Sequence, residues 1–315
     1  VLPVNGIPLV VVECKSPSVP EPLAEAVDQL RRYSNQRRAS GEVDDNEGNE
    51  SLFHTNQLLI VSDLFESRAA TIGAPPEAYL EWADTSPVPM SQVGEEVGLI
   101  PRKQEIAEAE EVASTELRAL GPEQADRAGT PLFYRQKATE TSTDAAQAVA
   151  PAADNKGLAS QQILVAGMLR PDHLLDVIRN FTLFQSGEGK TRKVVARYQQ
   201  FRAVHKAIER LKTGRSRAAG AERDERGGIV WHTQGSGKSL TMVFLVRKMR
   251  TLGDLRKFKI VVVTDRSDLE KQLRETASLT GETVRPSEGD KQRRESATAA
   301  TQRILAEESP DIVFA

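Results

Sequence analysis

The sequence has a single cysteine, Cys14, among its 315 residues. One cysteine excludes any disulfide within the chain, which fits a protein of the reducing cytoplasm. The sequence also lacks an apolar run of about 18 residues, and it has no charged start followed by a short apolar stretch. We therefore expect neither a secretory signal nor a membrane-spanning helix.

A large excess of charge is lacking as well. The 42 Lys and Arg residues nearly balance the 45 Asp and Glu residues, so the formal net charge is only -3. A global positive field is thereby excluded, and any contact with nucleic acid must come from local patches. The sequence has no internal repeat, and its length suggests two domains or one large one.

Strand and helix patterns alternate along most of the chain, which predicts an α/β protein. Apolar, β-branched runs predict buried strands over 7–14, 57–62, 228–232 and 257–266, and helical periodicity is clearest over 21–38, 193–212 and 238–250. Residues 96–160 are polar, rich in Ala, Glu, Gln, Thr and Pro, and indicate a mobile insertion. We expect a first domain over 1–95 and a second domain, built on a parallel sheet, over 161–315.

The stretch "IVWHTQGSGKSLTM" lies between a predicted strand and an apolar helix. Gly235, Ser236 and Gly237 let the backbone bend around phosphate oxygens, and the helix start adds its dipole. Lys238 would bind the β- and γ-phosphates of ATP, and the Ser239 hydroxyl would bind Mg²⁺. The alternative is a glycine-rich turn with an incidental lysine.

Two other groups of residues near this loop have simpler interpretations. The simpler interpretation of Trp231 and His232 is that they pack or shape the loop and take no part in chemistry. Thr264, Asp265 and Arg266 are the polar carboxyl end of the strand over 257–266, at the edge where open α/β sheets bind ligands. The alternative is a plain turn in which Ser267 or Asp268 caps the next helix.

A second charged motif, "VVVECKSP", lies near the start of the chain. Glu13 and Lys15 are two residues apart on a strand, so both side chains point to one face while Cys14 points the other way, into packing. A carboxylate that binds Mg²⁺ beside a lysine is the chemistry of a metal-dependent nuclease. The alternative is an ion pair at a solvated strand end.

The following helix places Gln29 and Tyr33 four residues apart on one face. Tyr33 also completes the apolar stripe of that helix, so a role in the core is an open alternative.

Taken in order, several segments resemble the R subunit of type I restriction enzymes. They are "NGIPLVVVECKSP", "QLRRYSNQR", "NQLLIVSD", "LLDVIRNFTLF", "ARYQQFRAVHKAI", "GGIVWHTQGSGKSLTM" and "IVVVTDRSDLEKQL". The resemblance implies a partial PD-(D/E)xK nuclease-like domain followed by a partial RecA-like motor domain. In such enzymes, this subunit translocates double-stranded DNA with ATP and Mg²⁺, cuts it, and works with specificity and methyltransferase subunits.

The resemblance also implies roles for individual residues. Glu13 and Lys15 match the last two members of the nuclease motif, and Gln29 and Tyr33 match its Gln-x-x-x-Tyr element. Gln200 matches a glutamine that reads adenine. Gly235, Gly237, Lys238 and Ser239 match helicase motif I, while Thr264, Asp265 and Arg266 match motif Ia, beside the DNA.

Some elements of that family fall outside the chain. The aspartate of the nuclease motif would precede Val1, and an Asp-Glu-Ala-His motif would follow Ala315. We therefore expect an internal fragment that, alone, neither cuts DNA nor hydrolyses ATP efficiently. The alternatives are a superfamily 2 helicase or remodeller with a non-catalytic nuclease-like domain, and a non-catalytic nucleotide-binding or interaction module.

Overall fold

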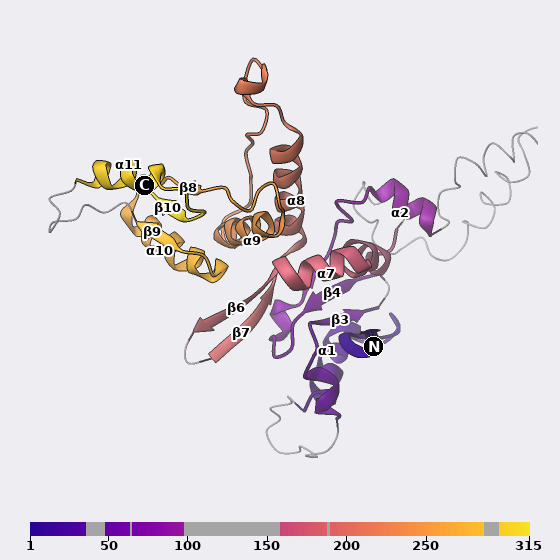
Figure 1. Ribbon diagram of the computed structural model, residues 1–315. Coiled ribbons are helices and arrows are strands. Elements are labelled where there is room, and N and C mark those ends of the chain that lie inside the picture. The colour runs from indigo at the N-terminus through magenta and orange to yellow at the C-terminus, as the bar shows by residue number, and fades with distance from the viewer. Residues whose placement is uncertain (36–47, 64, 98–157, 188–189, 287–295) are drawn as a thin grey trace, which may run out of the picture. The chain divides into compact units, whose positions relative to one another are not determined.

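The computed structural model describes residues 1–35, 48–63, 65–97, 158–187, 190–286 and 296–315 (Figure 1). The chain divides into two units, one made of Val1–Pro87 with Ser160–Ala315 and the other of Val88–Ala159. In the second unit, the described part contains helix α2 (Met90–Glu96). Most of the predicted insertion over 96–160 lies outside the described residues. None of the described helices is both long and apolar enough to span a membrane.

The first unit begins with a five-stranded mixed sheet. Its strands are β1 (Leu2–Val4), β2 (Ile7–Cys14), β3 (Leu58–Ser62), β4 (Ser67–Ala70) and β5 (Leu80–Glu81), in that spatial order. Strands β2 and β3 are parallel, with Val12 opposite Ile60, and the other neighbours are antiparallel. Helix α1 (Pro22–Tyr33) connects the parallel pair, as a crossover between parallel strands requires. Short 3₁₀ turns lie at Glu50–Phe53 and Pro76–Ala78.

The alternation of side chains along β2 gives this sheet two apolar faces. Val11 packs against α1, where Ala26, Val27 and Leu30 are buried. Val10 faces the opposite side, into a larger core that includes Trp82 and residues from after the insertion. That larger core draws on α6 (Ser160–Leu164), the π-helical turn η3 (Val165–Leu169), α7 (Pro171–Asn180) and α8 (Tyr198–Thr213).

A two-stranded hairpin follows α7. Its strands are β6 (Thr182–Gly187) and β7 (Lys190–Val195), paired antiparallel. The hairpin is joined to the first sheet through Lys193, whose Nζ donates to Asn56 O at 2.8 Å and whose carbonyl accepts from Thr71 Oγ1 at 2.6 Å. Burial lowers the pKa of the Lys193 ammonium.

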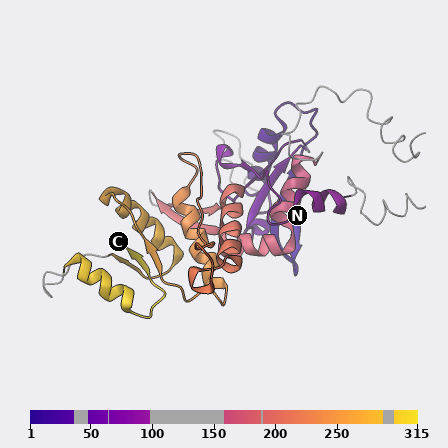
Figure 2. The ribbon, with the colours of Figure 1, turned by 90° about the horizontal axis from the view of Figure 1, so that it is seen from above.

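The C-terminal half contains the phosphate-loop candidate and a second sheet. Helix α9 (Lys238–Thr251) follows the loop, and β8 (Ile260–Val262), β10 (Ile312–Phe314) and β9 (Val284–Pro286) form a parallel sheet in that order. Helices α10 (Ser267–Ala277) and α11 (Ala297–Ala306) belong to the same half (Figure 2), with short 3₁₀ turns at Arg217–Ala219 and Ser278–Thr280. The prediction of an α/β protein with a parallel sheet is confirmed.

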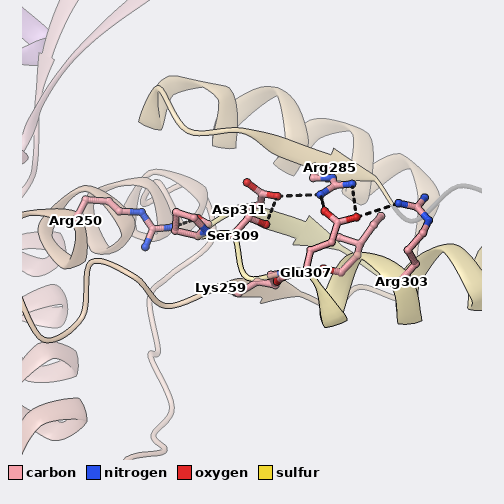
Figure 3. A network of polar contacts seen from close by, with 9 residues as sticks. Arg250, Lys259, Arg285, Arg303, Glu307, Ser309 and Asp311 are labelled. Carbon is pink, nitrogen blue, oxygen red and sulfur yellow. Dashed lines mark hydrogen bonds and ion pairs between the residues drawn. The ribbon is translucent and has the colours of Figure 1, made fainter.

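A network of charged side chains holds β9 and β10 to the end of α11 (Figure 3). Arg285 on β9 pairs with Glu307 and lies 3.1 Å from Asp311 Oδ2. Ser309 Oγ donates to the same Asp311 carboxylate at 2.7 Å, and Arg303 reaches Glu307 at 3.1 Å. Each carboxylate in this network therefore has a cationic partner, and the network connects the sheet edge to α11.

A second network lies between helices α7, α8 and α9. Asp176 receives hydrogen bonds from Lys248 Nζ and Asn180 Nδ2, each at 2.6 Å, and His205 Nε2 lies 2.9 Å from its carboxylate. Burial by itself raises the pKa of Asp176, but the three partners outweigh it and lower the pKa to about 2. The negative charge of Asp176 therefore stabilises the contact between these helices.

Replacing Asp176 with Asn is expected to destabilise the fold by at least about 2 kcal/mol at neutral pH, since the change leaves Lys248 without its counter-charge. The pKa of Asp176 is lower in the folded chain than in the unfolded chain. Its contribution is therefore complete above about pH 4 and is lost as the pH falls through about 2. Urea denaturation at pH 7 and pH 3 measures this, with Asp254→Asn as the control, because Asp254 is an exposed partner of Lys212. Equal stability of the two variants at pH 7 would contradict the interpretation.

The structure corrects several local predictions. Residues 228–232 form no strand: Ile229 is 95% exposed and Trp231 86% exposed, so the tryptophan does not pack beside the loop. A strand needs a neighbour that supplies backbone hydrogen bonds. Residues 228–232 have no such neighbour among the described strands, and β8 stays at the edge of its sheet. For the same reason β8 spans only three residues and is not buried, with Val261 44% exposed.

Smaller corrections concern termini and faces. Helix α10 has Arg266 at its N-cap with no side-chain cap, so neither Ser267 nor Asp268 caps it. Cys14 is exposed and accepts a hydrogen bond from Gln161 instead of packing in the core. Helix α1 ends at Tyr33, because Asn35 has a φ of +53°, a left-handed conformation that does not continue an α-helix. Residues 36–38 of the predicted helix lie outside the described residues. Helix α8 begins at Tyr198 and not at residue 193, because residues 190–195 pair with β6 as strand β7.

Candidate functional site

The end of strand β2 carries the first candidate site. Glu13 shares the α1 face of the sheet with Val11, and Lys15 continues that face, its N–H bonding Ser62 O at 2.9 Å. Lys15 Nζ lies 3.5 Å from Glu13 Oε1. Both side chains are largely shielded from solvent: Glu13 is 17% exposed and Lys15 is 14% exposed. The predicted pair is therefore present on one face, at the edge of the sheet.

Helix α1 brings the other two predicted residues to the same point. Lys15 Nζ donates to Gln29 Oε1, and Gln29 Nε2 donates to the Tyr33 hydroxyl. The four candidates Glu13, Lys15, Gln29 and Tyr33 therefore form one continuous chain of polar contacts. Tyr33 is 38% exposed, so it lies at this site and not in the apolar core, which was the alternative role for it.

Sequence reasoning missed one member of this group, Glu25. Its Oε1 accepts a hydrogen bond from Lys15 Nζ at 3.1 Å, closer than Glu13. The signal was available, since Glu25 lies four residues before Gln29 and eight before Tyr33, on the same helix face. We name these five residues the strand-end cluster.

The electrostatics of the strand-end cluster keep Lys15 positively charged. Its hydrogen bond to Glu25, and then the charges of Glu25 and Glu13, raise the pKa of the Lys15 ammonium. A protonated lysine cannot take a proton from water, but it can neutralise the negative charge on a phosphodiester. Among the described residues, no group of three or more acidic, histidine or cysteine side chains could hold a metal ion by itself.

The phosphate-loop candidate is the second site. Gly235 and Gly237 have φ values of +77° and +81°, a backbone conformation that favours glycine. The turn is closed by Ser236, whose N–H and Oγ both reach Thr233 O, at 3.3 and 2.6 Å. Helix α9 then starts at Lys238, so the first free N–H groups of a 14-residue helix face this loop.

The lysine of the loop is available to a ligand. Lys238 is exposed and, in the described part of the chain, has neither a hydrogen-bond acceptor nor an ion-pair partner. Ser239 follows it in the first turn of α9. An anion at the start of this helix would thus meet free N–H groups, the helix dipole and one lysine.

Gln200 lies next to this loop although it is far away in sequence. It is buried in the first turn of α8, and its Nε2 donates to Gly237 O at 2.9 Å and to Ser236 O at 3.4 Å. Its Oε1 accepts from Arg197 N at 2.8 Å. Gln200 and residues 235–237 are among the residues that line an open cleft of about 1260 Å³.

The third predicted group remains apart from the others. Thr264, Asp265 and Arg266 connect β8 to α10, with Asp265 and Arg266 exposed. Within the described part of the chain, the side-chain hydrogen bond of this group is local, from Arg266 N to Thr264 Oγ1 at 3.4 Å. Among the described residues, no hydrogen bond or ion pair joins this group to the phosphate loop.

Two family models match the two halves that carry these sites. Residues 1–77, which hold the strand-end cluster, match the model described as "Type I restriction enzyme R protein N terminus". Residues 199–315, which hold Gln200 and the phosphate loop, match the model described as "SWI2/SNF2 ATPase". The first part of the chain is thus similar to restriction-enzyme R proteins, and the last part is similar to SWI2/SNF2 ATPases.

Individual relatives point the same way. The chain is 29% identical over 276 residues to the type I restriction enzyme HindI endonuclease subunit of Haemophilus influenzae. The matched region covers 87% of this chain and 19% of the relative. Two Methanocaldococcus jannaschii proteins, each named "Putative type I restriction enzyme" (MjaIXP and MjaVIIP endonuclease subunits), are 37% identical over 115 and 112 residues. These matches cover 36% and 34% of this chain and 10% of each relative. The resemblance to R subunits of type I restriction enzymes is confirmed.

Proposed function

We propose that this chain is part of the restriction subunit of a type I restriction-modification system, which translocates double-stranded DNA with ATP and cuts it. In this proposal residues 1–95 belong to a nuclease-like domain of the PD-(D/E)xK kind, and residues 161–315 to the first RecA-like motor domain. The partners are DNA and the specificity and methyltransferase subunits, in the cytoplasm. The observation that carries the proposal is the strand-end cluster, in which Lys15 contacts Glu13 and Gln29 in the same chain as a helicase-type phosphate loop.

The nuclease half of the proposal depends on the charged residues of the strand-end cluster. Glu13 would hold Mg²⁺, which supplies Lewis-acid activation of water and phosphate when bound. The residues fit, since Mg²⁺ is commonly bound by one or two carboxylates plus water and phosphate, and Glu13 has a single partner, Lys15, in the described part of the chain. Lys15 would neutralise the charge on the phosphodiester. Gln29, oriented by the Tyr33 hydroxyl, would hold the Lys15 ammonium in position.

The motor half depends on the phosphate loop. The N–H groups at the start of α9 and the Lys238 ammonium would bind the triphosphate of ATP, and Ser239 would hold Mg²⁺. Thr264, Asp265 and Arg266 would lie along the DNA. The match to a SWI2/SNF2 ATPase over this half favours one other function, a DNA remodeller whose nuclease-like domain binds without cutting.

Cleavage assays separate these two functions. The restriction subunit, expressed from its gene with its partner subunits, would be incubated with unmodified plasmid, ATP and Mg²⁺. Linear product that disappears with Glu13→Ala supports the nuclease. ATP hydrolysis and DNA movement with no cleavage under any metal would instead establish the remodeller.

Within the nuclease half, Glu25→Gln is expected to slow DNA cleavage about tenfold, because Lys15 loses a charged hydrogen bond worth about 1.5 kcal/mol or more. DNA affinity and ATP hydrolysis should not change. Initial rates on plasmid DNA measure the effect, and Glu25→Asp should restore part of it. The matched control is Glu21→Gln, at the start of the same helix, where the side chain caps nothing. Identical rates for the two glutamine variants would exclude a role for Glu25.

A further inference from the structure

The hairpin of β6 and β7 carries a local excess of positive charge. Strand β7 reads KTRKVV, with three cations, and strand β6 reads TLFQSG, with no charged residue. The whole chain has a formal net charge of -3, so contact with nucleic acid requires a local patch of this kind. The hairpin lies outside the strand-end cluster, the phosphate loop and residues 264–266.

The base of this hairpin is fixed, whereas its outer part is open to solvent. Leu183 and Ala196 are buried in the larger core, and Arg247 Nη1 on α9 donates to Thr182 O at 2.9 Å. In Figure 1 the two strands run out side by side from the point where α7 ends and α8 begins. Further along β6, Phe184 is 62% exposed. The hairpin therefore presents its outer side chains from a rigid base.

Cross-strand pairing gives the hairpin two different faces. Residues directly opposite each other share a face, so Phe184 lies with Lys193 on one face, and Gln185 lies with Arg192 on the other. The Lys193 ammonium is already engaged, since it lies 5.9 Å from the centroid of the Phe184 ring and donates to Asn56 O. The Arg192 side chain is exposed and has neither a hydrogen-bond nor an ion-pair partner within the described ranges.

Arg192 is thus a guanidinium without a counter-charge from the described part of the chain. Glu77 and Glu81 line the same open cleft as Gln185 and Arg192, but no ion pair between described residues joins either carboxylate to Arg192. Arginine and glutamine side chains are donors that commonly contact phosphate oxygens of DNA, and a two-stranded ribbon is narrow enough to enter the major groove. A role without a ligand is also open to Arg192, because charge on an exposed strand prevents pairing with other chains.

We infer that the face of Gln185 and Arg192 contacts the backbone of double-stranded DNA, with the Arg192 guanidinium at a phosphate. The inference rests on the proposed function, in which DNA is the substrate. It adds a DNA contact outside the three groups of candidate residues. The contact is independent of base sequence, because a phosphate carries no sequence information.

Binding of the restriction subunit, expressed from its gene, to a short fluorescent DNA duplex tests this. Because one phosphate contact makes affinity vary with salt to the power of about -0.9, Arg192→Ala should weaken binding about eightfold at roughly 0.1 M salt and about threefold at roughly 0.3 M. Arg192→Lys keeps the charge and should retain most of the affinity. The control is Arg256→Ala, at an exposed position between α9 and β8, which should change neither value. Fluorescence anisotropy measures all four proteins.

Thermal unfolding should show that Arg192→Ala is as stable as the unmodified subunit, since the side chain is exposed. A loss of affinity by the same factor at both salt concentrations would overturn the phosphate contact. Unchanged affinity would overturn it too, and added aggregation of the variant would then assign Arg192 to protection of the strand edge. Each of these outcomes leaves the proposed function in place, because the unmodified subunit still binds DNA. An unmodified subunit that bound no DNA would overturn the inference and the proposed function together.

Discussion

Replacing Lys238 with alanine is expected to weaken binding of a Mg²⁺-bound ATP analogue by about tenfold to a hundredfold, the effect of losing one charge-assisted hydrogen bond. ATP hydrolysis by the assembled enzyme should fall further, by about a hundredfold or more, since the same charge acts on the transition state. The physical reason is that Lys238 is exposed at the start of α9 and has no other partner among the described residues. Equilibrium binding and phosphate-release assays measure the two effects.

The control for Lys238 is another exposed lysine of the same half. Lys257 lies between α9 and β8, and Lys257→Ala removes the same charge from a different place. It should leave both binding and hydrolysis unchanged. If Lys238→Ala bound the analogue as tightly as Lys257→Ala, the loop would be a glycine-rich turn without a phosphate.

Replacing Lys15 with alanine is expected to lower the rate of DNA cleavage by about a hundredfold to a thousandfold, the size typical for removal of one group that stabilises transition-state charge. ATP hydrolysis should continue at its normal rate, because no hydrogen bond or ion pair in the described residues links the strand-end cluster to the phosphate loop. Gel assays of plasmid cleavage and parallel ATPase assays would be run on the same preparations. Glu13→Ala should behave in the same way.

A matched acidic residue gives the control for Glu13. Glu77 is exposed near the same sheet and has no partner in the described residues, so Glu77→Ala should cut DNA normally. Equal cleavage activity of Glu13→Ala and Glu77→Ala would contradict the prediction. That outcome would reduce the contact between Glu13 and Lys15 to an ion pair at a strand end.

Elements whose signal is local could be predicted from the sequence. Strand β2 begins and ends at the predicted residues, Ile7 and Cys14. Its middle residues Val10 and Val11 are buried on opposite faces of the sheet, as predicted, whereas both ends of the strand are exposed. Helix α9 begins at Lys238, as the glycines before it required. The contact of Glu13 with Lys15 also follows from spacing alone, since alternate residues on a strand share a face.

Features that depend on distant partners could not be predicted. Residues 228–232 have the composition of a strand, but a strand exists only where a neighbour supplies hydrogen bonds, and β8 offers them none here. The contact of Gln200 with Gly237 joins residues 37 positions apart, and it arises from the packing of α8 on α9. Glu25 belongs to no motif, and only the helix face that it shares with Gln29 and Tyr33 places it at the cluster.

The two tryptophans of the chain occupy opposite environments. Trp82 is 3% exposed, inside the larger core and edge-on to Phe201, whereas Trp231 is 86% exposed and lies four residues before Gly235. Their fluorescence is therefore separable, with Trp82 emitting at shorter wavelength and Trp231 open to a soluble quencher such as acrylamide. The chain thus carries one optical probe of its core and another of the approach to the phosphate loop, and neither requires a label.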